Sequence, residues 1–230
     1  MIRFFAKCVL LLLPTFCGHA GSLNFNGIAG AGNYDVPLTT FLERRFKTVY
    51  KQQYDFSCGS ATLASLLTYH YDDTVDEQSV FVDMYRNGDQ QKIQKQGFSL
   101  LDIKLYLERR GYRSDGFKIN LDQLIVANVP AITIINNNGY LHFVIIKGLN
   151  EQEVLLGDPS AGIKAVPRDE FETMWDKRIL FLIHDQQDVA ARHFQDQQEW
   201  ALRVKAPLGS AVDRAGLGQF NMLQPERGDF

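Results

Sequence analysis

Cys58 is the residue whose type and setting most strongly indicate chemistry. It follows Ser57 at the predicted start of an apolar helix over Gly59–Tyr71. Unpaired backbone N–H groups and the helix dipole at such a start stabilise a thiolate, which is the nucleophilic form of cysteine. Ser57 is the expected N-cap of this helix. On this residue alone, a buried and inert thiol remains the alternative.

A histidine and an aspartate further along the chain are candidates to complete such a site. His142 stands early in an otherwise apolar strand predicted over Tyr140–Lys147. A histidine beside a thiol can form an ion pair with the thiolate and then protonate the leaving amine. Asp158 ends the next predicted strand, sixteen residues later. If the two strands pair, its carboxylate can fix the tautomer and orientation of the imidazole.

Each of these residues also has an ordinary interpretation. His142 taken alone is compatible with a satisfied core histidine, and Asp158 begins a run, Asp-Pro-Ser-Ala-Gly, that suits a simple turn. Gln52, six residues before Cys58, can donate its side-chain amide to a developing oxyanion together with the Cys58 backbone N–H. Gln53 is the alternative donor, and an exposed glutamine without a catalytic role is the alternative interpretation.

The elements that must position these residues fall into two groups along the chain. Apolar residues at three- and four-residue spacing predict helices first, over Gly59–Tyr71, Val75–Tyr85 and Ser99–Arg110. Ser99 and Asp102 resemble a capping box at the start of the third helix. From Pro130 the pattern changes to short β-branched runs separated by turn residues, which predict strands. This order indicates an α+β fold, with N-terminal helices packed on an antiparallel sheet.

The sheet is expected to draw on five runs, over residues 131–135, 140–147, 153–157, 163–166 and 178–183. Three further segments are expected to be regular. Residues 41–50 are expected to be a strand or an extended segment, residues 121–127 a short helical turn and residues 168–175 a helix.

The first 20 residues have the pattern of a secretory signal peptide. Arg3 and Lys7 form a basic start, an apolar run follows over Cys8–Leu13, and small residues precede a cleavage point near Ala20. We therefore expect the mature protein to be periplasmic or secreted. A retained anchor and a lipoprotein attached at Cys17 are the alternatives.

Removal of this segment would leave Cys58 as the only cysteine, so no internal disulfide is expected. It would also remove Arg3 and Lys7, which changes the formal net charge from −3 to −5. A mildly acidic chain without a basic tract is a poor nucleic-acid binder. We expect no bound nucleotide, because no phosphate-binding loop motif is present. We also expect no metal, no other cofactor and no membrane span beyond the signal segment.

The candidate residues, taken as an ordered set, resemble a known family. Gln52 six places before Cys58-Gly59, then His142-Phe143-Val144, then Asp158-Pro159 with Gly162, is similar to family thirty-nine of the cysteine peptidases. These papain-like enzymes are best known as the bacteriocin-processing domains of peptide-exporting ABC transporters. The resemblance covers about Tyr50–Ile183. It implies proteolysis by a Cys58–His142–Asp158 triad, with Gln52 in the oxyanion hole.

The resemblance also suggests how the chain is organised. We expect a signal peptide over residues 1–20, an N-terminal extension over 21–49, the cysteine peptidase domain over 50–183 and a C-terminal tail over 184–230. The tail is expected to be helical only near Val189–Leu202. Transporter-fused relatives carry membrane and ATPase domains that we do not find here. The chain looks like a stand-alone exported member, some of which occur in operons for secretion of functional amyloid.

Expected partners are therefore a peptide or protein substrate, with a secretion-system or amyloid component among the candidates. Two other classes of function stay open. One is a non-catalytic peptide-binding or docking module of the same fold. The other is a different Cys–His–Asp enzyme, such as a cell-wall hydrolase or a transglutaminase, although the position of Gln52 and the Asp-Pro-x-x-Gly run argue against it.

Overall fold

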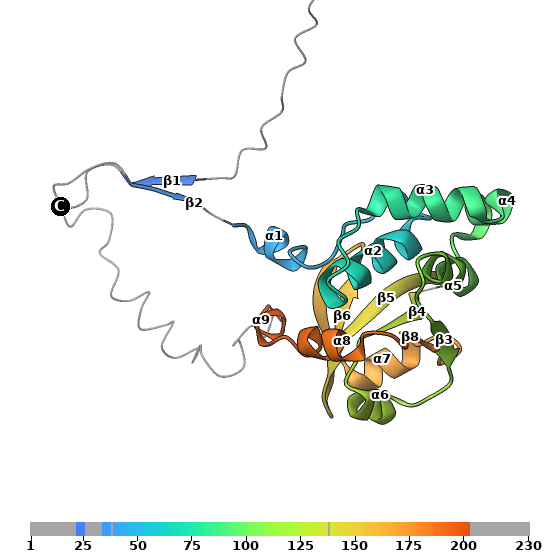
Figure 1. Ribbon diagram of the computed structural model, residues 1–230. Coiled ribbons are helices and arrows are strands. Elements are labelled where there is room, and N and C mark those ends of the chain that lie inside the picture. The colour runs from blue at the N-terminus through green and yellow to red at the C-terminus, as the bar shows by residue number, and fades with distance from the viewer. Residues whose placement is uncertain (1–21, 26–33, 38, 138, 203–230) are drawn as a thin grey trace, which may run out of the picture. The chain divides into compact units, whose positions relative to one another are not determined.

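The computed structural model describes residues 22–25, 34–37, 39–137 and 139–202 (Figure 1). The predicted signal segment, residues 1–20, lies outside the described residues. The chain divides into two compact units between Phe41 and Leu42. In the first unit, β1 (Ser22–Phe25) and β2 (Tyr34–Pro37) pair in antiparallel fashion.

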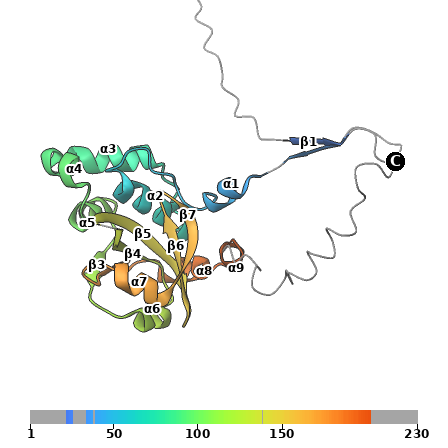
Figure 2. The same ribbon diagram turned by 180° about the vertical axis from the view of Figure 1, so that it is seen from behind.

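The second unit is built around an antiparallel sheet that has six strands in the described part of the chain. β5 (Tyr140–Leu149) is central and pairs with β4 and β6. From His142 to Leu149 every residue of β5 is buried, because helices cover both faces of the sheet (Figures 1 and 2). The order across the sheet is β3 (Ser114–Phe117), β8 (Leu180–Ile183), β4 (Ala131–Asn137), β5, β6 (Glu153–Asp158) and β7 (Gly162–Pro167).

The helices that precede the sheet in the chain lie together against one of its faces. They are α2 (Cys58–His70), α3 (Glu77–Asn87), α4 (Gln90–Gln96) and α5 (Leu100–Arg109) (Figure 1). The other face carries α6 (Leu121–Ala127) and α7 (Arg168–Met174). This arrangement confirms the predicted α+β fold with N-terminal helices packed on an antiparallel sheet.

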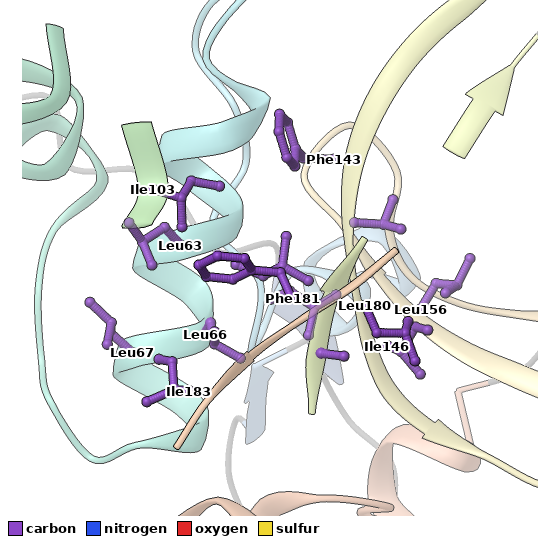
Figure 3. Close-up of a cluster of buried hydrophobic side chains, with 14 of the residues drawn as sticks. Leu63, Leu66, Leu67, Ile103, Phe143, Ile146, Leu156, Leu180, Phe181 and Ile183 are labelled. Carbon is purple, nitrogen blue, oxygen red and sulfur yellow. The ribbon is translucent and has the colours of Figure 1, made fainter. Parts of the chain in front are cut away.

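The core lies between α2 and the sheet, where Leu63, Leu66 and Leu67 of α2 point toward Phe181 and Ile183 of β8 (Figure 3). All five side chains are almost completely buried. α5 begins with the predicted capping box, in which the Ser99 hydroxyl accepts from the Asp102 backbone N–H and the Asp102 carboxylate accepts from the Ser99 N–H. Burial of this apolar surface fixes α2, and with it the position of Cys58.

Three local predictions differ from the structure. The segment over residues 41–50 begins as a helix, α1 (Phe41–Arg45), because Leu, Glu and Arg are good helix formers. Helix α4 was not predicted because Ile93 is its only buried residue, so it shows no apolar period. Strand β3 was missed because it is a short edge strand of mixed composition that pairs only with β8.

Beyond β8 the described chain forms α8 (Gln187–His193) and α9 (Gln197–Trp200). Ala190 and Phe194 belong to the main core. Trp200 packs in a second buried cluster with Val49, Leu155 and Ile163. The C-terminal segment up to Leu202 therefore shares the core of the second unit, and residues 203–230 lie outside the described residues.

Candidate active site

Cys58 is the first residue of α2, and its side chain is buried. Gly59 permits the start of α2 to approach its neighbours closely, since a Cβ atom at this position would lie 2.9 Å from the Cβ of Phe98. A glycine therefore follows the cysteine because a larger residue would clash with Phe98.

Ser57 occupies the N-cap position, but its side chain makes no capping hydrogen bond to α2. Its hydroxyl accepts from the Tyr54 N–H at 3.1 Å and donates to the Tyr54 carbonyl at 3.0 Å. The predicted N-cap position is therefore confirmed, but its side chain does not cap the helix: the hydroxyl closes the turn that leads into α2 and leaves the first N–H groups of α2 without this partner.

His142 and Asp158 form a buried pair. His142 Nε2 lies 2.7 Å from Asp158 Oδ1, and both side chains are almost fully buried. The two residues meet because β5 and β6 pair in antiparallel register, with Ile145 opposite Gly157. Tyr140 stacks on the imidazole, with ring centroids 5.9 Å apart. The structure thus brings together two of the predicted site residues that are distant in the sequence.

The Asp158 carboxylate is held by a dense set of donors. Oδ1 also accepts from the Ser160 backbone N–H at 2.8 Å and from the Ser160 hydroxyl at 2.6 Å. Oδ2 accepts from Lys164 Nζ at 2.8 Å. Burial by itself would raise the pKa of Asp158, but the hydrogen bond from His142 and the charge of Lys164 hold this pKa well below its usual range. Asp158 is therefore a fixed anion.

Lys164 is a site residue that the sequence analysis missed. It lies on β7, which pairs with β6 so that Leu156 is opposite Lys164. Its spacing of six residues from Asp158 carries no recognisable motif. Only the tight β6–β7 turn brings its ammonium to the carboxylate.

The electrostatics of the pair keep the imidazole charged. Burial opposes the imidazolium, but the hydrogen bond to Asp158 and then the Cys58 thiol raise the pKa of His142 to about 9. Nδ1 has no hydrogen-bond partner among the residues that the structure describes. With Nε2 bound to Asp158, Nδ1 is the nitrogen left for the thiol and for a leaving group. Near neutral pH this side chain is a proton donor and the natural counter-ion of a thiolate.

Gln52 is anchored to the same corner of the molecule. Its backbone N–H donates at 3.0 Å to the carbonyl of Pro159, the residue that follows Asp158 in the chain. Its side-chain Oε1 is buried and has no hydrogen-bond partner within the described ranges. Gln53, the alternative candidate, is exposed. The role of Gln52 as an oxyanion donor stays a prediction.

A cleft of about 950 Å³ opens beside Cys58. Its apolar walls come from the loop before α2, from the α4–α5 connection and from the β4–β5 hairpin. Tyr140 ties this hairpin to the loop, because its hydroxyl donates to the Asp55 carbonyl at 2.5 Å. Lining residues include Phe56, Phe98, Leu100, Ile134, Leu141 and Phe143. This volume accommodates several residues of an extended peptide.

In the described portion of the chain, no group of three His, Cys, Asp or Glu side chains is arranged to hold a metal ion. No helix in that portion is long and apolar enough to span a membrane.

Helices packed on an antiparallel sheet, with a cleft beside a cysteine at a helix start, are the architecture of papain-like cysteine peptidases. Residues 46–187 match the model of the Peptidase C39 family. The chain belongs to this family and is a cysteine-type peptidase, as the resemblance in the sequence predicted.

Two relatives and one solved structure are among the proteins that are similar to the chain. The "Probable functional amyloid protease FapD" of Pseudomonas fluorescens is 33% identical over 221 residues, covering 95% of this chain and 96% of the relative. Its namesake from Pseudomonas aeruginosa PAO1 is 36% identical over 217 residues, covering 94% and 96%. The crystal structure of the peptidase domain of Streptococcus ComA, a bifunctional ABC transporter in a quorum-sensing pathway, aligns with a TM-score of 0.50 at 18% identity. The alignment covers 59% of this chain and 96% of that domain, and it supports the assignment of the fold.

Proposed function

We propose that this protein is a periplasmic cysteine endopeptidase that cuts a peptide or exported protein. Cys58 is the nucleophile, His142 the acid and base, Asp158 the group that orients His142, and Gln52 an oxyanion donor. The observation that carries the proposal is the buried His142–Asp158 pair, with Nε2 and Oδ1 2.7 Å apart. The pair joins the neighbouring strands β5 and β6, and β5 also contributes to the wall of the cleft that Cys58 lines.

The reaction follows from the charges of these groups. The imidazolium of His142 stabilises the Cys58 thiolate, which attacks the carbonyl carbon of the scissile peptide. The Gln52 side-chain amide and the Cys58 backbone N–H stabilise the oxyanion that forms. Nδ1–H of His142 then protonates the leaving amine, which leaves a thioester on Cys58. His142, now neutral, takes a proton from water, and the resulting attack on the thioester releases the acid product.

Asp158 acts throughout without reacting. It remains an anion because five donors, the Ala161 backbone N–H among them, surround its carboxylate, so it keeps Nε2 protonated and Nδ1 directed to the reaction.

The names of the relatives support a proposal for the substrate class. Both are called functional amyloid proteases, and we propose that a component of an amyloid system or of its secretion apparatus is the substrate here. The predicted signal segment motivates the periplasmic location. Cell fractionation and N-terminal sequencing test this location, and a mature chain that begins at Gly21 is expected.

Thiol alkylation tests the activated nucleophile. We expect iodoacetamide to modify Cys58 in the mature protein faster than it modifies free cysteine at mildly acidic pH, because the proposed reaction uses this sulfur as a nucleophile beside an imidazolium. His142→Ala should remove this advantage. A rate no faster than that of free cysteine would contradict the thiolate–imidazolium pair.

Mass spectrometry of periplasmic proteins, from cells with the wild type and with Cys58→Ala, tests proteolysis itself. Fragments that disappear in the variant identify the substrate. A Cys58→Ala strain with unchanged amyloid secretion and unchanged fragments would instead indicate a binding module. Release of peptidoglycan fragments by the pure protein would indicate a cell-wall hydrolase.

A further inference from the structure

The C-terminal strap, which we define as residues 187–202 with helices α8 and α9, begins where the match to the family model ends. It is nevertheless integrated with the sheet. The Gln195 N–H donates to the carbonyl of Lys147 on β5 at 2.8 Å, and Phe194 and Trp200 are buried. The strap is therefore part of the folded enzyme.

A buried ion pair joins the strap to two other segments. Lys147 is completely buried, and its Nζ lies 2.7 Å from Oε1 of Glu199 in α9. The same ammonium donates to the carbonyl and to the hydroxyl of Thr48, each at 3.0 Å. The Thr48 hydroxyl in turn hydrogen bonds to Glu199 Oε1. Loss of one charge of such a pair leaves the other buried without compensation, so this junction depends on all three side chains.

Packing reinforces the junction next to Thr48. Val49 is buried among Leu155, Ile163 and Trp200. Trp200 lies so close to β5 that a Cβ atom on Gly148 would be 3.1 Å from its indole Nε1. Val49 is thus enclosed by the strap together with residues of β6 and β7.

The residues after Val49 lead directly to the catalytic corner. The Tyr50 N–H donates to the Ser65 hydroxyl of α2 at 2.8 Å. The Gln52 N–H donates to Pro159, beside Asp158, at 3.0 Å. One end of this five-residue segment, 48–52, is therefore held by the strap, and its other end presents Gln52 to the site.

We propose that the C-terminal strap is a positioning element of the active site, in which Glu199 and Trp200 hold Gln52 in place through Thr48 and Val49. The inference rests on the proposed function, since it assigns a task to the oxyanion donor of that reaction. Glu199 and Trp200 are positioning residues, because they contact neither the substrate nor the reacting atoms.

Glu199→Gln tests the strap, with Glu151→Gln as the matched control. Glu151 is an exposed glutamate, so its substitution makes the same change of charge away from the junction. We expect Glu199→Gln to lower kcat tenfold or more with little change in KM. The upper bound is the loss caused by Gln52→Ala, which we expect to be about 10²–10³-fold for an oxyanion donor. Alkylation of Cys58 by iodoacetamide forms no oxyanion, so its rate should not change.

Thr48→Val provides a milder second variant, because it removes only the hydroxyl at the junction and keeps the shape of the side chain. Both variants should be non-additive with Gln52→Ala in a double-mutant cycle. In amide hydrogen exchange, both should also lose protection over residues 48–52 while Leu63–Leu67 of α2 stays protected.

Several outcomes would overturn the inference. They are a Glu199→Gln enzyme with unchanged kcat, effects that add fully to those of Gln52→Ala, an equal loss of alkylation rate, or unchanged exchange over residues 48–52. A wild type without Cys58-dependent hydrolysis would instead overturn the proposed function, and hydrogen exchange would then still decide whether the strap orders this segment.

Discussion

Asp158→Asn should move the alkaline limit of activity to lower pH. Hydrolysis through a thiolate–imidazolium pair requires a protonated His142, so activity ends as pH rises through the pKa of this residue. That pKa is raised to about 9. Asparagine can still accept a hydrogen bond from Nε2, but it lacks the negative charge that stabilises the imidazolium.

The size of the effect follows from the pKa. Raising the pKa of His142 from 6.5 to about 9 corresponds to about 3 kcal/mol in favour of the imidazolium. In the variant, burial would still lower this pKa and Cys58 would still raise it, so we expect it to return close to the ordinary histidine value, at about 7. At pH 8 the protonated fraction would then fall from about nine-tenths to about one-tenth, whereas at pH 6 it would hardly change. The ratio of wild-type to variant kcat/KM should therefore grow about tenfold between pH 6 and pH 8.

The assay is kcat/KM for a peptide substrate from pH 5 to pH 10. Lys164→Gln is the matched control of opposite sign, because it removes a cation that Asp158 contacts. Its alkaline limit should stay near pH 9 or rise. The reasoning is refuted if Asp158→Asn keeps the wild-type alkaline limit, or if Lys164→Gln lowers the limit as much as Asp158→Asn does.

Three further predictions concern stability. The folded-state pKa of His142 lies above its unfolded value, so the contribution of His142 to the free energy of unfolding is complete below about pH 6.5 and is lost as pH rises through about 9. The Tm of the wild type should therefore fall over this pH range, and the Tm of His142→Gln should fall less. Gly162→Ala should lower the free energy of unfolding by more than about 1 kcal/mol, since φ is +77° and the new Cβ would lie 2.6 Å from the Arg45 carbonyl oxygen. Leu63→Ala, at a fully buried position of α2, should cost about 2–5 kcal/mol in urea unfolding.

Two controls separate these effects from general damage. Gly111 also has a positive φ, of +84°, but open space around its missing Cβ, so Gly111→Ala should carry the strain without the clash. Val126 is 86% exposed, so Val126→Ala should leave stability almost unchanged. Equal losses for Gly162→Ala and Gly111→Ala would contradict the role assigned to the Arg45 contact, and equal losses at positions 63 and 126 would contradict the assigned core.

Local signals predicted the elements of the fold that carry strong patterns. The period of Leu63, Leu66 and Leu67 predicted α2, and Ser99 with Asp102 predicted the start of α5, because both signals act within one or two helical turns. Helix α4, with one buried residue, offered no such pattern. Ser57 had the right type for a cap, yet its hydroxyl bonds to Tyr54, because a turn competed successfully for the same side chain.

The sequence by itself determined the chemistry available to this protein: a cysteine at a helix start, then a histidine and an aspartate in strands that follow one another. Their identities and order were sufficient to predict the family. Only the tertiary structure decided that the imidazole of His142 meets Asp158, that Lys164 completes the carboxylate's shell, and that Glu199 reaches Thr48 from 151 residues away. These contacts depend on strand register and on the packing of the C-terminal strap. Both are set by burial across the whole domain, which no short stretch of sequence encodes.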